Sequence, residues 1–193
     1  MLNRYNSRAK GAVMARVPYL QRMDLPKEAQ AKAEHIEATW GRIPRPLQLI
    51  LHSPGISASV SDLMKVLQSA TSLDPITREL AVLTVSRLLD CAFEWAFHER
   101  SAPKTGVRPE AIAAIKARRW EALNADEQRV AEYVWQMVAN RVTDESFRGL
   151  EAALGIQGAV ELTVTVGYYV MLCTTTNALA IDLPDALPST LGS

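Results

Sequence analysis

The sequence predicts an all-α protein. Helix start signals, in which a capping side chain precedes proline, recur along the chain and are followed by apolar residues at helical spacing. No segment has an evident partner strand with which to form a sheet. With 193 residues, 48% of them hydrophobic, the chain is long enough to bury a sizeable core without disulfides or a structural metal.

Three helices and one short apolar segment, 47–52, are predicted in the first half of the chain. Asp24 supplies a cap shortly before the first segment, and Gly41 ends it. Two prolines then interrupt the chain ahead of a short apolar segment. Ser53 and Asp74, each followed directly by proline, begin the next two helices. The predicted segments are 27–40, 47–52, 54–70 and 75–89.

Five further helices are predicted in the second half. Asp90 is expected to cap a helix that Gly106 ends, and Gly155 is expected to end another. The last segment is ambiguous, because residues 162–166 are rich in the β-branched side chains that favour strands. Its length and the lack of a partner strand favour a buried helix. The predicted segments are 91–104, 110–119, 126–140, 143–154 and 158–180.

The charge balance argues against nucleic acid as the main partner. The chain has 21 basic and 21 acidic side chains, giving a formal net charge of zero, whereas nucleic-acid binding normally needs a basic face. A chain without net charge is also prone to self-association. We find no segment long and apolar enough to cross a membrane, since the most apolar stretch, 159–181, contains Glu161, Gly167 and Asn177.

The two ends of the chain are expected to be tails. Residues 1–16 are basic and free of acidic side chains, which indicates a solvated, flexible tail or, as the alternative, an organelle-targeting segment. They lack the apolar core of a secretory signal, so a cytoplasmic location is expected. Residues 17–183 are predicted to form a single helical domain, and residues 184–193 a C-terminal tail.

Four chemically active side chains are predicted to meet between two helices. Cys91, Glu94 and His98 are spaced at i, i+3 and i+7, which places them on one stripe of a helix. Glu79 lies in the preceding helix, which a short connection lays antiparallel to the first. An imidazole beside buried carboxylates can accept and donate protons near neutral pH. The cluster therefore predicts a proton-transfer site.

Each of these residues also has a purely structural interpretation. Cys91 is a small side chain that packs well in a core. Glu94 and His98 can form a surface pair, and Glu79 can favour the positive end of its helix. His52 precedes a helix start and is expected to cap the helix or serve the loop rather than catalysis, and Cys173 is expected to be a core residue. A metal site would combine His52, His98, Glu79 and Glu94, but their spacing matches no known metal signature.

The segment 78–106 resembles the core motif of the carboxymuconolactone decarboxylase / alkylhydroperoxidase-D-like family. It opens with Arg-Glu-Leu, continues with Cys-x-x-Glu-Trp-x-x-His, and ends with Lys-x-Gly-Val. Glu79 matches the glutamate of the family motif, Cys91 its first cysteine and His98 its histidine. The resemblance covers 17–183, with the core motif in 75–106, and is to the longer subgroup with additional N-terminal helices. It implies an alkylhydroperoxidase-D-like helical bundle, a homo-oligomer, and no metal or organic cofactor.

The chain departs from the peroxidase branch of this family at Glu94. In that branch a second cysteine occupies this position and attacks the hydroperoxide. Cys91 thus lacks a partner thiol in its own helix, and the sequence leaves open whether Cys173 approaches it. In the decarboxylase branch, the resemblance implies that His98 donates a proton to the carbon that loses carbon dioxide. Glu79 then orients His98 or relays its proton, and Glu94 is a second acid/base group or positions the substrate.

Three functions remain open on this basis. The first is cofactor-free acid/base chemistry on a small carboxylated or lactone substrate, for which Arg78 and Arg87 are the nearest candidates to bind the carboxylate. The second is a thiol-dependent hydroperoxide reductase, an antioxidant enzyme that uses Cys91. The third is a non-catalytic oligomeric binding protein. The predicted site residues are the same four in the two enzyme hypotheses: Glu79, Cys91, Glu94 and His98.

Overall fold

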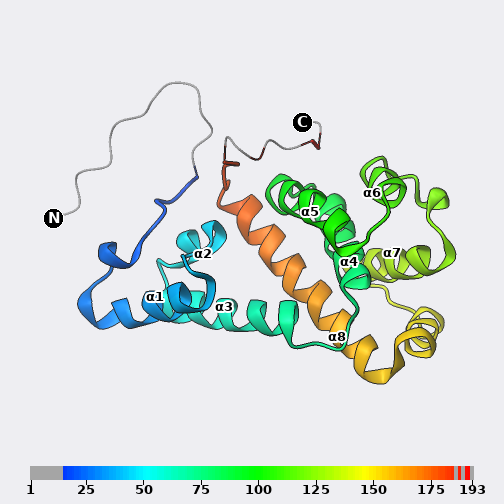
Figure 1. Ribbon diagram of the computed structural model, residues 1–193, viewed down its shortest axis with the longest axis horizontal. Coiled ribbons are helices and arrows are strands. Elements are labelled where there is room, and N and C mark those ends of the chain that lie inside the picture. The colour runs from blue at the N-terminus through cyan, green and yellow to red at the C-terminus, as the bar shows by residue number, and fades with distance from the viewer. Residues whose placement is uncertain (1–14, 185–186, 188–189, 192–193) are drawn as a thin grey trace.

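The computed structural model describes residues 15–184, 187, 190 and 191, and these residues form helices and no strands. The all-α prediction is confirmed. Figure 1 shows α8 running diagonally through the molecule, with α1–α3 on one side of it and α4–α7 on the other. The elements are η1 (Arg22–Asp24), α1 (Lys27–Trp40), α2 (Arg45–Ile50), α3 (Pro54–Ser69), α4 (Pro75–Leu88), α5 (Ala92–Thr105), α6 (Pro109–Lys116), η2 (Trp120–Ala122), α7 (Ala125–Val138) and α8 (Asp144–Ala178).

Most helix ends lie where the capping residues predicted them. Gly41 ends α1 in the left-handed conformation, with φ of 74°, and its N–H donates to the carbonyl of Glu37. Asp74 caps α4, because its carboxylate accepts hydrogen bonds from the N–H groups of Ile76 and Thr77. The predicted cap at Asp90 is wrong: Asp90 has a left-handed φ of 47°, and Cys91 is the N-cap of α5.

The two helices predicted over 143–154 and 158–180 are joined at Gly155. This residue has φ of 69° and ψ of 168°, which breaks the helical backbone without a loop. The β-branched residues 162–166 are helical, as predicted. As one element, α8 is long enough and apolar enough, with a mean hydropathy of 1.3, to meet the criteria for a membrane-spanning helix. The sequence alone predicts no such segment. Half of the most apolar window of α8 is buried inside the protein.

Two hydrophobic clusters form the core. The larger is built around α4, with Leu83 and Val85 fully buried against α5, α7 and α8. The smaller contains Ile36 and Leu47 and joins α1, α2 and α3. Partly buried side chains of α3, among them Met64, contact both clusters and connect them. The N-terminal helices therefore pack beside the core that holds α4, α5 and α8.

The predicted N-terminal tail lies outside the described residues except for Ala15 and Arg16. Arg16 is attached to the end of α8, because its backbone N–H donates to the carbonyl of Leu179 and its guanidinium to the carbonyl of Ala178. The predicted C-terminal tail 184–193 is described only in part. Within it, Thr190 accepts a hydrogen bond of 3.2 Å from the indole of Trp95.

The cap at Asp74 is expected to stabilise the protein measurably. Asp74→Ala removes the acceptor for two N–H groups at the start of α4 and should lower the free energy of unfolding by about 1 kcal/mol. Ser53→Ala is the matched control, since Ser53 is the N-cap of α3 but its side chain makes no capping hydrogen bond. Urea denaturation of the three proteins tests this; equal losses in both variants would contradict it.

Candidate active site

Three of the four predicted residues meet where α4, α5 and α8 pack together. Glu79 comes from α4, and Glu94 and His98 come from α5. His98 Nδ1 lies 2.9 Å from Glu79 Oε2, and His98 Nε2 lies 3.7 Å from Glu94 Oε2. The ring of Tyr169, from α8, meets the His98 ring edge-on at 5.4 Å between centroids. The imidazole is thus held by one carboxylate and faces a second.

All of these polar side chains are buried. The exposed fractions are 7% for Glu79, 4% for Glu94 and 6% for His98. Ser101 donates a hydrogen bond of 3.2 Å to Glu79 Oε2, which helps to fix that carboxylate. Glu94 differs, because its Oε1 is buried without a hydrogen-bond partner among the described residues. A buried polar atom normally has a partner, so Glu94 Oε1 marks a position available to a ligand.

The electrostatics make Glu79 and His98 an ion pair. Burial alone raises the pKa of Glu79, but the hydrogen bonds from His98 and Ser101 and the charge of His98 more than offset it, so this pKa lies below its ordinary value. Burial alone lowers the pKa of His98, but its hydrogen bond to Glu79 and the charges of Glu79 and Glu94 raise it overall. Glu79 is therefore a carboxylate and His98 an imidazolium over the range between the two pKa values.

Glu94 has the opposite tendency to Glu79. Burial raises the pKa of its carboxyl group, and the charge of His98 lowers it only in part. The two carboxyl groups therefore differ in their affinity for protons although both face the same imidazole. Such a difference assigns separate acid and base roles to two like groups in one site.

Cys91 lies at the edge of this cluster, against α8. Its Sγ is 3.4 Å from Thr176 Oγ1, and Cys173, one helical turn before Thr176, lies near enough to act on its pKa. Both thiols are free and fully buried. The neighbouring Cys173 thiol lowers the pKa of Cys91, whereas the Cys91 thiol and burial raise the pKa of Cys173. The structure thus answers the open question: Cys173 does approach Cys91.

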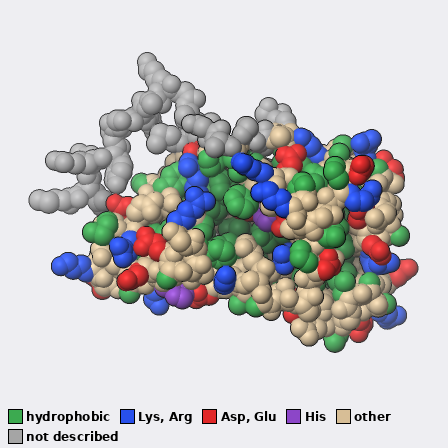
Figure 2. Space-filling model, in the orientation of Figure 1, with side chains coloured by type: hydrophobic (Ala, Val, Ile, Leu, Met, Phe, Trp, Pro, Cys, Tyr) green, Lys and Arg blue, Asp and Glu red, His purple; other side chains and the backbone are tan. Residues whose placement is uncertain are grey.

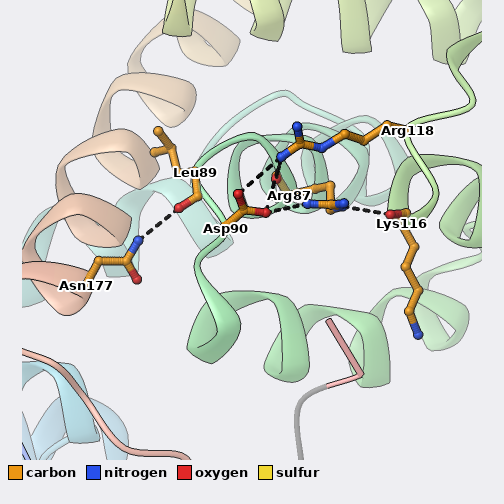
Figure 3. Close-up of polar contacts among 6 residues, drawn as sticks. All are labelled: Arg87, Leu89, Asp90, Lys116, Arg118 and Asn177. Atoms are coloured by element: carbon orange, nitrogen blue, oxygen red, sulfur yellow. Dashed lines mark hydrogen bonds and ion pairs between the residues drawn. The ribbon is translucent and has the colours of Figure 1, made fainter. Parts of the chain in front are cut away.

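The turn that places Cys91 is held from two sides, as Figure 3 shows. Arg87 donates to the carbonyl of Lys116 at 2.7 Å and pairs with Asp90, which also receives Arg118 at 3.2 Å. On the other side, the Asn177 amide of α8 donates to the carbonyl of Leu89 at 2.9 Å. These contacts fix the left-handed backbone at Asp90, and with it the start of α5.

The two arginines proposed as carboxylate ligands differ in availability. Arg87 is occupied by Asp90 and the carbonyl of Lys116, which makes it the less available candidate. Arg78 makes no side-chain hydrogen bond or ion pair with any described residue. Its charge nevertheless acts on the pKa values of both Glu79 and His98. Arg78 is thus the free cation near the cluster within the described part of the chain.

Two cavities of the chain lie away from this chemistry. One of about 480 Å³ is lined by α4, α7 and the start of α8 and contains the Arg108–Glu127 ion pair, and another of about 380 Å³ lies between Trp120 and Trp135. Neither contains a predicted site residue. Figure 2 shows a hollow lined by hydrophobic side chains between the N-terminal helices and α5, over α8. We regard the buried cluster as the site, because it has the acid/base groups.

Two members of the site were not predicted as functional. Ser101 lies three residues after His98, so helical spacing places it on the same face, and this signal was available in the sequence. Tyr169 has no local sequence signal that relates it to His98, because its position against that ring follows only from the packing of α8. His52 lies in the turn before α3, as expected, and contacts the carbonyl of Pro18 at 3.0 Å. The described residues contain no group of three His, Cys, Asp or Glu side chains arranged to hold a metal ion.

Comparison with solved structures supports the fold. The chain is similar to an uncharacterised peroxidase-related protein with an alkylhydroperoxidase AhpD core from Ralstonia eutropha JMP134, at 15% identity and a TM-score of 0.73, over 92% of this chain and 96% of that one. A peroxidase-related protein from Silicibacter sp. TM1040 gives 14% identity and a TM-score of 0.74 over 94% and 97%. The debrominase Bmp8 is similar at 16% identity and a TM-score of 0.68, over 90% of this chain and 92% of that one. The predicted alkylhydroperoxidase-D-like fold is therefore confirmed.

Comparison of sequences supports the family. No curated protein matches the chain closely enough to count as a relative. The model of the carboxymuconolactone decarboxylase family matches residues 54–134, a segment that contains α3 to α7 and all four predicted site residues. Over residues 54–134 the chain is therefore similar to the carboxymuconolactone decarboxylase family.

Proposed function

We propose that this protein is a cofactor-free acid/base enzyme that acts on a small carboxylated or lactone substrate, with His98 as its proton donor. The observation that carries the proposal is the position of His98 between a paired and an unpaired carboxyl group. The family whose model matches residues 54–134 includes decarboxylases by name, which agrees with this class of reaction.

The two nitrogens of His98 have different tasks in the proposed reaction. Nδ1 is bound to Glu79, which keeps the ring protonated and oriented. Nε2 is 3.7 Å from Glu94 Oε2, too far for a hydrogen bond, so its proton is available to a substrate atom. Loss of carbon dioxide leaves an electron pair on carbon, and proton transfer from Nε2 to that carbon completes the reaction.

Glu94 is the proposed second acid/base group. Its raised pKa keeps a proton on the carboxyl group to higher pH than usual, and its Oε1 has no partner among the described residues. A protonated carboxyl group can donate a hydrogen bond to a substrate oxygen that gains charge. Glu94 beside His98 is thus proposed to act as a neutral acid that donates a hydrogen bond to the substrate.

Arg78 is the proposed ligand for a substrate carboxylate, because it is unpaired within the described residues and acts electrostatically on the cluster. Arg78→Gln should raise KM about tenfold or more for a carboxylated substrate, with a smaller effect on kcat, since one charged hydrogen bond is lost. Arg100→Gln is the matched control on α5, an exposed arginine without a side-chain contact in the described chain. Equal KM values for both variants would remove Arg78 from the site.

His98→Gln should abolish most of the activity. Carboxymuconolactone is the first substrate to try, with carbon dioxide release as the readout, because the family takes its name from this compound. Loss of the proton donor should lower kcat by about 10² to 10⁴-fold. His52→Gln, which replaces an exposed histidine outside the cluster, should leave kcat unchanged. A His98→Gln protein that is folded by circular dichroism and turns over at the normal rate would refute the proposed role, as would the absence of turnover of carboxylated lactones by the wild-type protein.

The Glu79–His98 pair should also appear in the pH dependence of stability. The raised pKa of His98 contributes stability that is complete below its ordinary value of 6.5 and is lost as pH rises through the raised pKa. The lowered pKa of Glu79 contributes stability that is complete above 4.5 and is lost as pH falls. Between pH 4.5 and 6.5 the free energy of unfolding of the wild type should therefore be about 3 kcal/mol greater than that of Glu79→Gln. At alkaline pH the difference should be smaller.

Urea denaturation at a series of pH values measures this difference. Asp62→Asn is the matched control, because the His35–Asp62 pair has the same chemistry but is more than half exposed on both sides. An exposed pair should contribute little at any pH. A difference between wild type and Glu79→Gln that stays constant from acid to alkaline pH would show that the two groups are not an ion pair.

A further inference from the structure

We propose that the cavity between η2 and α7 binds a small quaternary ammonium compound, an organic cation of the kind that choline represents. The cavity has a volume of about 380 Å³, within the range of about 300–1,000 Å³ that is usual for small-molecule sites. None of its lining residues belongs to the cluster around His98. The inference therefore goes beyond the acid/base reaction and is independent of it.

Two tryptophan side chains form the apolar walls of this cavity. Trp120 comes from η2 and is half-buried, and Trp135 comes from α7 and is 42% exposed. The face of an indole ring attracts a cation that lies within about 6 Å of its centroid, more strongly than other aromatic rings do. Trp135 already makes one such contact, because the guanidinium carbon of Arg141 lies 4.1 Å from its ring centroid. Arg141 does not line the cavity, so this contact lies outside it.

Two carboxylates supply negative charge to the same cavity. Glu121 and Glu132 line it, and none of its lining residues is a lysine or an arginine. Glu132 Oε1 accepts a hydrogen bond of 3.2 Å from the Gln136 amide, which orients the group. Glu132 Oε2 and the carboxylate of Glu121 have no hydrogen bond or ion pair with any described residue. A cation in the cavity would therefore meet two carboxylates without competition from the lining.

The two walls are held in place by the protein itself. The wall from α7 is one stripe of the helix, with residues spaced at i, i+3, i+4 and i+7: Gln128, Ala131, Glu132 and Trp135. The Gln128 amide donates to the carbonyl of Leu123, the residue that ends η2, at 2.8 Å. Leu123 is in turn buried in the core. Little rearrangement is needed on binding, which favours affinity.

The lining favours a quaternary nitrogen over other cations. Metal cations such as Ca²⁺ and Mg²⁺ need six or more oxygen ligands, counting water, whereas indole rings offer none. A primary ammonium has three N–H donors, each of which needs an acceptor. A quaternary nitrogen has no donor to satisfy, and its methyl groups can pack against the faces of Trp120 and Trp135. Aromatic side chains are the usual partners of such cations.

Titration with choline chloride, followed by NMR of the indole N–H groups, tests the proposal. The chain contains four tryptophans, and single replacements assign their four signals. Choline should shift the signals of Trp120 and Trp135 in a saturable manner and leave that of Trp40 unchanged. Trp40 is the matched internal control, because its ring already has Lys65 at 5.6 Å and its helix, α1, lies on the other side of α8 (Figure 1). Sodium chloride at the same concentrations controls for ionic strength.

The charge of the ligand is the variable that decides the outcome. The neutral isostere of choline, in which carbon replaces the nitrogen, has the same shape without the charge. It should bind about fivefold more weakly or worse, because the cation–π attraction is lost. Equal affinities for choline and its isostere would overturn the proposal, as would choline shifts no larger than those caused by sodium chloride.

Two variants assign the roles of the lining residues. Trp135→Leu keeps an apolar side chain but removes the ring, and should weaken choline binding by about fivefold or more. Glu132→Gln keeps the shape but removes the charge, and should weaken binding most at low salt, where exposed charges are least screened. Both side chains are exposed, so both variants should fold.

Glu151→Gln is the matched control for the loss of charge, since it replaces an exposed glutamate on α8 outside the cavity. It should bind choline as the wild type does. Wild-type affinity in both Trp135→Leu and Glu132→Gln would overturn the proposal. None of these measurements involves turnover, so the test of His98→Gln with carboxymuconolactone is unaffected by their outcome.

Discussion

The ion pair between Glu79 and His98 is the interaction on which the organisation of the site depends. A charged imidazole with 6% exposure is tolerable only beside a fixed opposite charge, because its loss of solvation must be offset. The pair joins α4 to α5 and so favours one register between the two helices. Ser101, in turn, holds the Glu79 carboxylate. The same ion pair therefore determines both the protonation of the site and the packing of α4 against α5.

The long helix α8 completes the site from the opposite side. It brings Tyr169 against the His98 ring and Cys173 against Cys91, and it is attached through Asn177 to the turn between α4 and α5. That turn depends on Asp90, whose left-handed backbone is held by Arg87 and Arg118. The start of α5 is thus fixed by residues that do not take part in the proposed chemistry. These residues keep the acid/base cluster and Cys91 next to one another.

Local signals made much of this predictable from sequence. The caps at Gly41 and Asp74 depend on neighbouring residues only, and helical spacing placed Glu94 beside His98. The errors arose where a long-range contact decides. Asp is a common helix-capping residue, but Asp90 pairs with Arg118, which follows α6, and lies in the turn before α5 instead. The contact of Cys91 with Cys173 depends on how α8 packs, and no local pattern records that.

The most direct test of the account is the pKa of the His98 imidazole, measured by NMR as a function of pH and assigned by its loss in His98→Gln. The account predicts a pKa above the ordinary value of 6.5 in wild type, and a lower one in Glu79→Gln, because the buried carboxylate of Glu79 holds the proton on the ring. A wild-type pKa at or below 6.5, unchanged by Glu79→Gln, would mean that burial dominates and that His98 is neutral. In that case His98 would not be the proton donor.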